Sequence, residues 1–76
     1  MEYTVDDKMK ARLENDYAYH APKDDQETRY VQIRLAAKEL AWIIVKLSPP
    51  SREQSIALTL LDKVVMEANA AIARNE

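Results

Sequence analysis

LSPPSRE, at residues 47–53, is the only break between the two long helical patterns of this 76-residue chain. Two adjacent prolines cannot continue a helix, because each lacks an N–H donor and its ring clashes with the preceding turn. Pro49 also disfavours the helical conformation at Ser48. Ser51 then offers a capping hydroxyl, and Gln54 three residues later completes a capping-box pattern. So short a turn predicts two helices folded back as an antiparallel hairpin.

Apolar residues recur every three or four positions on both sides of the turn, which predicts helices over about 25–47 and 52–74. The first helix has a predicted seam at Tyr30, Ile33, Ala37, Leu40, Ile44 and Leu47. The second has one at Ala57, Leu61, Val64, Ala68 and Ala71, widened by Leu58, Val65 and Ile72. Each helix also has apolar residues off its seam, such as Trp42 and Leu60. Because a hairpin has a single interface, the surplus predicts contact with other copies of the chain.

The N-terminal part predicts a short helix over about 5–17, with Thr4 as its cap and a narrow stripe at Met9, Leu13 and Tyr17. Pro22 marks the loop at 18–24. Asp24 is the predicted cap of the following helix, with Glu27 three residues on.

Composition predicts one small all-α domain, residues 1–76, that assembles into a compact homo-oligomer. A chain this short buries only about 60% of its unfolded surface and needs a further source of stability. It has no cysteine and one histidine, so oligomerisation is the remaining route. The net charge of −2 gives no basic surface for duplex nucleic acid. We expect neither a signal peptide nor a membrane helix, because the chain begins without a basic and apolar leader and has no apolar run near 20 residues.

The turn also sets which residues lie level on the paired helices. With its centre near residues 49–50, positions that sum to about 99 face each other, so Tyr30 is level with Asn69 and Asp25 with Arg74. Polar residues therefore gather at the open end of the hairpin: His20, Lys23, Arg29, Tyr30, Asn69 and Arg74.

The predicted positions of these polar residues in the hairpin do not favour a catalytic site or a metal site. His20 lies at the opposite end from Ser48, Ser51 and Ser55, so a Ser-His-Asp triad cannot form within one chain. The acidic pairs at residues 6–7 and 24–25 are explained by helix starts. No closely spaced ligand set for a metal is present. We expect no enzyme activity and no cofactor.

A site for an anionic small molecule fits the open end better. Lys23 precedes a helix start, where the dipole favours phosphate. Tyr30, Tyr19 or Tyr3 would stack on a base. Arg74 or Arg34 would bind a phosphate with the guanidinium fork.

Structural alternatives remain for each of these residues. Tyr30 occupies a seam position, and Arg74 can pair with Asp25 or neutralise the helix C-terminus. Lys23 can be a solvated loop residue, and His20 an exposed loop residue or a helix cap. Asn69, a poor residue for a helix interior, offers its amide to a base edge or to another chain.

Several segments together resemble a known family. They are YHAPK at 19–23, Arg29-Tyr30 followed by Arg34, PSRE at 50–53 and, above all, ANAAIARNE at 68–76. They resemble the hairpin domain of the phage anti-CBASS cyclic-nucleotide sponges and the related anti-Thoeris sponges, over about residues 17–76.

The resemblance implies a non-enzymatic phage counter-defence protein of the host bacterial cytoplasm, often a homohexamer. It would sequester cyclic oligonucleotide messengers, so that CBASS effectors are not activated. Cyclic dinucleotides would lie between protomers, cyclic trinucleotides in separate axial pockets of some members, and a cyclic ADP-ribose isomer in anti-Thoeris members. Lys23 matches the loop lysine of the first pocket, and Asn69 and Arg74 match the C-terminal motif. The stacking residue stays open among the four tyrosines: Tyr3, Tyr17, Tyr19 and Tyr30.

The chain lacks the extra N-terminal region of the longer anti-Thoeris members, which favours the anti-CBASS branch. Two alternatives stay open. One is a sponge for a cyclic ADP-ribose isomer, and the other is a structural module that binds a partner protein through its apolar flanks.

Overall fold

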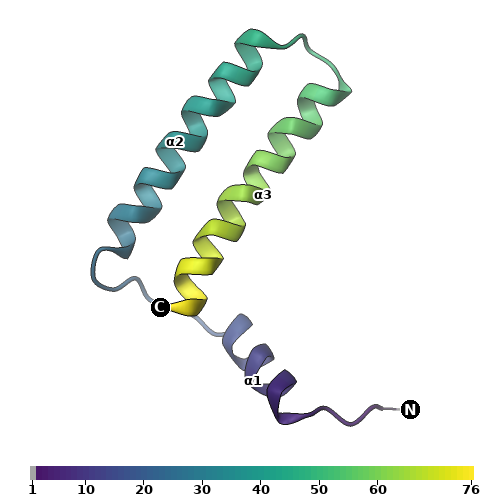
Figure 1. Cartoon of the computed structure of the whole chain (residues 1–76), viewed down its shortest axis with the longest axis vertical. Helices are drawn as coiled ribbons and strands as arrows, with labels where there is room; N and C mark the ends of the chain where they lie inside the picture. Colours follow the sequence, from purple (N-terminus) through teal and green to yellow (C-terminus); the bar gives the residue numbers. More distant parts are fainter. Residues whose placement is uncertain (1) are drawn as a thin grey trace.

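The computed structural model describes residues 2–76 and contains three helices. They are α1 (Asp7–Asp16), α2 (Gln26–Leu47) and α3 (Arg52–Asn75), and residues 2–76 contain no strand. Helices α2 and α3 run antiparallel, side by side, and α1 points away from their open end (Figure 1). The all-α prediction is confirmed. Helix α1 is shorter than the expected range of 5–17.

The turn between α2 and α3 is built as the prolines require. Ser48 is extended, with φ −124° and ψ 148°, directly before Pro49. The Ser51 hydroxyl accepts from the backbone N–H of Gln54 at 3.1 Å, so the predicted cap is confirmed. The Gln54 side chain, however, does not return to Ser51. It donates to the Ser48 carbonyl at 2.9 Å and to the Ser48 hydroxyl at 3.1 Å, and so ties the two ends of the turn together.

The other two predicted caps are wrong. Helix α1 is capped by Asp6, whose carboxylate accepts from the backbone N–H of Met9 at 2.8 Å, and Thr4 lies outside it. Asp24 does not cap α2, because its φ of 52° places it in the left-handed region of the loop. Asp25 takes the cap position without a side-chain bond to the helix backbone; its carboxylate lies 3.2 Å from the Nε of Arg29 instead.

The interface between α2 and α3 differs from the predicted seam at a few positions. Its half-buried positions on α2 include Tyr30, Ile33, Ala37, Ala41 and Ile44, while on α3 they include Ala57, Leu58, Leu61, Val65, Ala68 and Ile72. The predicted seam members that fall outside it are Leu40, Leu47, Val64 and Ala71, all exposed. On α2, Ala41 takes the place of Leu40. On α3, Val65 and Ile72, which were predicted only to widen the seam, take the places of Val64 and Ala71.

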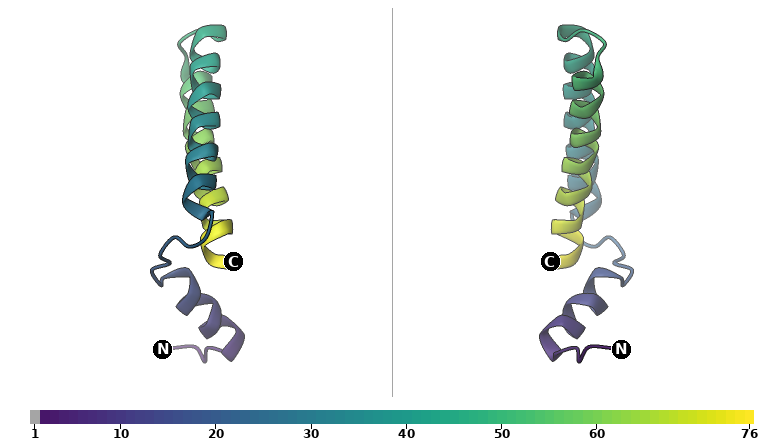
Figure 2. Two further views of the ribbon diagram at one scale, coloured as in Figure 1. Left: turned by 90° about the vertical axis from the view of Figure 1, so that its left-hand side faces the viewer. Right: turned by 90° about the vertical axis from the view of Figure 1, so that its right-hand side faces the viewer.

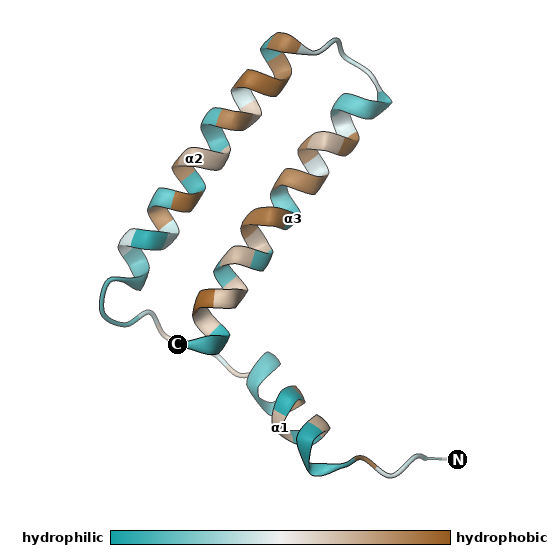
Figure 3. Cartoon of the chain, viewed as in Figure 1, coloured by the Kyte–Doolittle hydropathy of each residue, from teal (hydrophilic) through white to brown (hydrophobic). Residues whose placement is uncertain are grey.

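No apolar side chain is buried among the described residues, so the hairpin has no core of its own. The molecule measures 50 × 39 × 13 Å, and its two long helices form a single layer (Figure 2). Its radius of gyration is 17.1 Å, against about 11 Å for a compact domain of this length. Large apolar side chains remain exposed on both long helices, among them Leu35, Trp42, Val45, Leu60, Val64 and Met66 (Figure 3).

None of the helices within residues 2–76 combines the length and the hydrophobicity needed to cross a bilayer.

Candidate functional site

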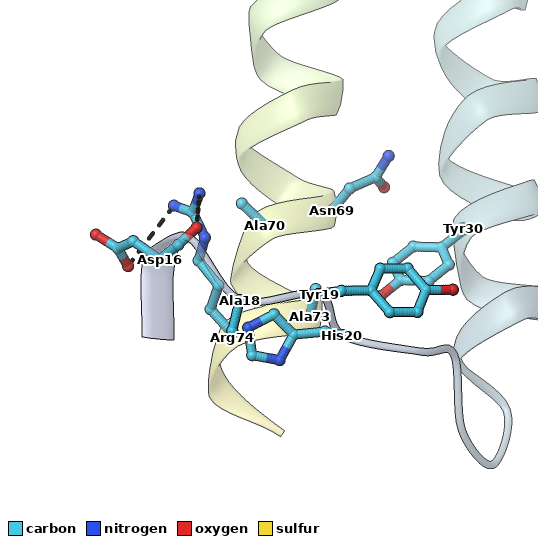
Figure 4. A pocket seen from close by; sticks show the side chains of 9 residues that line it. All are labelled: Asp16, Ala18, Tyr19, His20, Tyr30, Asn69, Ala70, Ala73 and Arg74. Carbon is cyan, nitrogen blue, oxygen red and sulfur yellow. Dashed lines mark hydrogen bonds and ion pairs between the residues drawn. The ribbon is translucent and has the colours of Figure 1, made fainter. Parts of the chain in front are cut away.

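A cavity of about 380 Å³ opens where the loop after α1 meets the open end of the hairpin. Its walls come from the end of α1, the loop that follows, the first turns of α2 and the last turns of α3. The residues that line it are Asp16, Ala18, Tyr19, His20, Tyr30, Asn69, Ala70, Ala73 and Arg74 (Figure 4). Two aromatic rings, one guanidinium, one imidazole and one amide thus border the same space. A volume of this size is within the usual range for small-molecule sites.

The register set by the turn explains why residues far apart in the sequence share this cavity. Tyr30 and Asn69 both line it, as the sum of 99 predicts. His20 and Arg74 line it as well, so four of the seven predicted site residues come together. The other three, Lys23, Arg34 and Tyr3, do not.

Arg74 is held by the end of α1. Its Nη2 donates to the Asp16 carbonyl at 3.2 Å, and its Nη1 lies 3.9 Å from the Asp16 carboxylate. The predicted alternative, a pair between Arg74 and Asp25, is wrong, because Asp25 is paired with Arg29. The loop after α1 brings Asp16 to Arg74 across 58 positions of sequence, and no sequence pattern indicated that contact.

His20 also ties the loop to α1. Its Nε2 lies 2.8 Å from the carbonyl oxygen of Asn15, which can only accept, so this nitrogen carries the proton. The Asn15 amide in turn donates to the Arg74 carbonyl at 3.1 Å. His20 therefore helps to form the wall of the cavity by fixing the path of the loop.

The aromatic and amide groups have different exposures. Tyr30 is half-buried between the helices, whereas Tyr19 is 87% exposed. Asn69 is half-buried, and its Oδ1 is enclosed without a hydrogen-bond partner among the described residues. Because an unsatisfied buried acceptor costs about 1–3 kcal/mol, Asn69 is poorly explained as a purely structural residue of an isolated hairpin.

The three predicted residues outside the cavity are exposed. Lys23 lies in the loop before α2, where its backbone N–H donates to the Gln26 side chain at 3.2 Å. Arg34 is exposed on α2, one turn beyond Tyr30. Tyr3 precedes α1 and is 85% exposed.

A second polar cluster closes the open end of the hairpin next to the cavity. Arg29 donates from both terminal nitrogens to the two carboxylate oxygens of Glu76, and the Gln26 amide donates to Glu76 at 3.2 Å. Gln26 is the most buried polar residue described, at 3% exposed. Hydrogen bonds from Arg29 and then Gln26 lower the pKa of Glu76 to about 2. The same bond with Glu76 raises the pKa of Arg29 above its ordinary value. Sequence reasoning placed Arg29 at this end but gave it no partner.

Residues 2–76 contain no cluster of three or more His, Cys, Asp or Glu side chains that could hold a metal ion. His20 faces the backbone of α1, and the serines at positions 48, 51 and 55 lie at or beside the turn. The functional groups that line the cavity are thus two phenol rings, one guanidinium, one imidazole, one carboxylate and one amide.

Fold and cavity together define a class: a small helical hairpin with a cavity lined by polar and aromatic side chains at its open end. Within that class, the sequence model described as "Acb2/Tad1, hairpin domain" matches residues 9–73. The match covers most of the chain, which therefore belongs to the Acb2/Tad1 hairpin family. Neither a curated protein nor a solved structure gives a significant match. The family is that of the anti-CBASS and anti-Thoeris sponges, phage proteins that bind cyclic nucleotides and are not catalysts.

Proposed function

We propose that this protein binds and sequesters cyclic oligonucleotide messengers of bacterial antiphage immunity without cleaving them. Its ligands are cyclic dinucleotides and, in pockets of a second type, cyclic trinucleotides, and it acts in the host bacterial cytoplasm against CBASS. The observation that carries the proposal is the shared cavity of Tyr19, Tyr30, Asn69 and Arg74 in a chain of the sponge family.

Each cavity residue has a role suited to a nucleotide. The tyrosine rings stack on a base, worth roughly 1–3 kcal/mol for each base. The Arg74 side chain is 42% exposed, and its guanidinium binds a phosphate with two parallel hydrogen bonds. Asn69 presents both a donor and an acceptor to the edge of a base.

The site is completed by assembly into a homo-oligomer, which we propose to be a hexamer. The hairpin alone buries no apolar side chain and exposes large apolar residues on both long helices. Packing copies together covers these residues and brings equivalent open ends near one another. Lys23, Arg34 and Tyr3 then contribute to ligand contacts from positions outside the cavity of a single chain.

Calorimetry against a panel of cyclic dinucleotides, cyclic trinucleotides and cyclic ADP-ribose isomers tests the proposal. We expect tight binding of at least one cyclic oligonucleotide, and mass spectrometry of the ligand after denaturation should return it intact. R74A should weaken binding while sedimentation shows an unchanged oligomer. R52A provides a matched loss of charge beside the turn, at the opposite end of the hairpin, and should weaken binding less. If no member of the panel binds, the proposal is wrong, and a converted ligand would show an enzyme instead.

The same family includes anti-Thoeris sponges, so a cyclic ADP-ribose isomer is the second candidate ligand. Binding of that isomer without any cyclic oligonucleotide would favour it. A third candidate is a protein-interaction module, which the exposed apolar residues favour. Recovery of a defined partner protein, together with no nucleotide binding, would support it.

A further inference from the structure

We propose that Asp16 is a positioning residue for Arg74: its backbone carbonyl holds the guanidinium at the cavity, and a ligand phosphate replaces its carboxylate on binding. This inference rests on the proposed function. It adds a residue that sets the affinity of the site.

Asp16 contacts Arg74 through one hydrogen bond and one longer ion pair. The Arg74 Nη2 makes a hydrogen bond of 3.2 Å with the backbone carbonyl of Asp16, which keeps the guanidinium at the edge of the cavity. The carboxylate of Asp16 lies farther away, at 3.9 Å from Nη1. Arg74 is thus oriented toward the cavity without being fully paired. A phosphate, with its oxygens spaced to match the guanidinium fork, makes the shorter and better directed contacts.

Asp16 has a second cation close by. Its other carboxylate oxygen lies 3.5 Å from the Nε of Arg12, one turn earlier on α1. When a phosphate takes its place on Arg74, the carboxylate therefore keeps one charged partner. With the Asp16 side chain a quarter exposed, water can solvate the rest. The exchange leaves no charge buried and unpaired.

Two hydrogen bonds between α1 and α3 are accepted by backbone carbonyls, and neither uses the Asp16 carboxylate. One runs from the Arg74 guanidinium to the Asp16 carbonyl, and the other from the Asn15 amide to the Arg74 carbonyl. Helix α1 has no buried residue, and its apolar side chains Met9 and Leu13 are each more than 40% exposed. In Figure 4 the dashed contacts of Asp16 and Arg74 lie at one side of the cavity, and the tyrosines at the other. A phosphate that replaces the Asp16 carboxylate therefore leaves both hydrogen bonds between α1 and α3 in place.

Calorimetry with D16N gives the first test, because the change removes the competing charge and keeps the backbone carbonyl. We expect the cyclic oligonucleotide bound by the wild-type protein to bind D16N about three- to tenfold more tightly, as expected for removing one charge about 4 Å from the cation. E14Q removes the same charge from α1 at a residue with no ion pair in the structure, and should change affinity less than twofold. Equal effects of D16N and E14Q, or weaker binding by D16N, would overturn the inference. The proposed function would still stand, because the wild-type protein binds. A wild-type protein that binds nothing would overturn both.

Spin labels give the second test. The sequence has no cysteine, so K10C and E53C place one label on α1 and one near the turn. A small amount of doubly labelled chain mixed with unlabelled chain reports the distance within one protomer. Saturation with the cyclic oligonucleotide should leave that distance distribution unchanged, because both hydrogen bonds between α1 and α3 are kept. A shifted or broadened distribution, with binding verified by calorimetry on the same sample, would show that the Asp16 carbonyl also leaves Arg74 and would overturn the positioning role.

Discussion

The Arg29 guanidinium donates to both carboxylate oxygens of Glu76, a residue 47 positions further along the chain. The pair joins the first turn of α2 to the end of α3, and the nearly buried Gln26 adds a third hydrogen bond to the same carboxylate. Tyr30 directly follows Arg29, and Arg74 lies two residues before Glu76. This network therefore sets the distance between the two long walls of the cavity.

Replacing Glu76 with Gln should destabilise the hairpin, because Arg29 then loses its bidentate charged acceptor. The loss should depend on pH. The pKa of Glu76 is lowered from 4.5 to about 2, so its contribution is complete above the unfolded value and disappears as pH falls toward 2. Urea unfolding at a fixed protein concentration should show a constant difference between wild type and E76Q above about pH 5, shrinking at lower pH.

R29Q supplies the control for that pair. The double variant R29Q/E76Q should lose less stability than the sum of the two single variants, because both remove the same contact. Additive losses would show that Glu76 and Arg29 act independently.

Replacing Ser51 with Ala should cost about 1 kcal/mol of unfolding free energy, since its hydroxyl caps α3 through the N–H of Gln54. S55A is the matched control. Its position is exposed on the same helix, and its hydroxyl caps nothing. Denaturant unfolding measures both variants, and an equal effect of the two would contradict the cap as a source of stability.

Tyr19 and Tyr17 form a matched pair for the stacking role. Both are 87% exposed and lie two residues apart, but only Tyr19 lines the cavity. Y19A should weaken cyclic-nucleotide binding by roughly 1–3 kcal/mol, which is about fivefold to more than a hundredfold. Y17A should leave the affinity nearly unchanged. Calorimetry measures the affinity of both variants. Equal losses of affinity would show that the position of Tyr19 in the cavity is not the reason for the effect of Y19A.

The exposed apolar surface of α3 should hold the assembly together. Val64 is 61% exposed and Leu60 57% exposed, on a helix whose opposite face already packs against α2. V64D should shift the oligomer to smaller species in sedimentation, because assembly would bury a charge. S55D introduces the same charge at an exposed polar position of α3 and should leave the oligomer intact. A V64D oligomer of wild-type size would place the interface elsewhere.

Most of the secondary structure was predictable because its causes are local. The prolines at 49 and 50, the Ser51 cap and the repeating apolar residues all act within a few positions of the chain. The cap of α1 was assigned to Thr4 rather than Asp6 because two nearby side chains offer acceptors, and only the backbone path selects one of them. The seam position of Tyr30 is confirmed, whereas Leu40 lies outside the interface, because a helical repeat of about 3.6 residues counted from Tyr30 returns to the same face at Ala41.

In the candidate site, too, the sequence alone determines some contacts and the tertiary structure determines the others. By placing Pro49 and Pro50 at the turn, the sequence alone determined that Tyr30 and Asn69 face each other, because rigid helices carry a register over their whole length. The partners of Arg74 and Glu76 were decided only by the tertiary structure. They depend on the loop at 17–25, whose left-handed Asp24 and lack of periodicity leave its path open until the helices it joins are in place. Short-range sterics thus set the hairpin, and the irregular loop decides which charges meet at its open end.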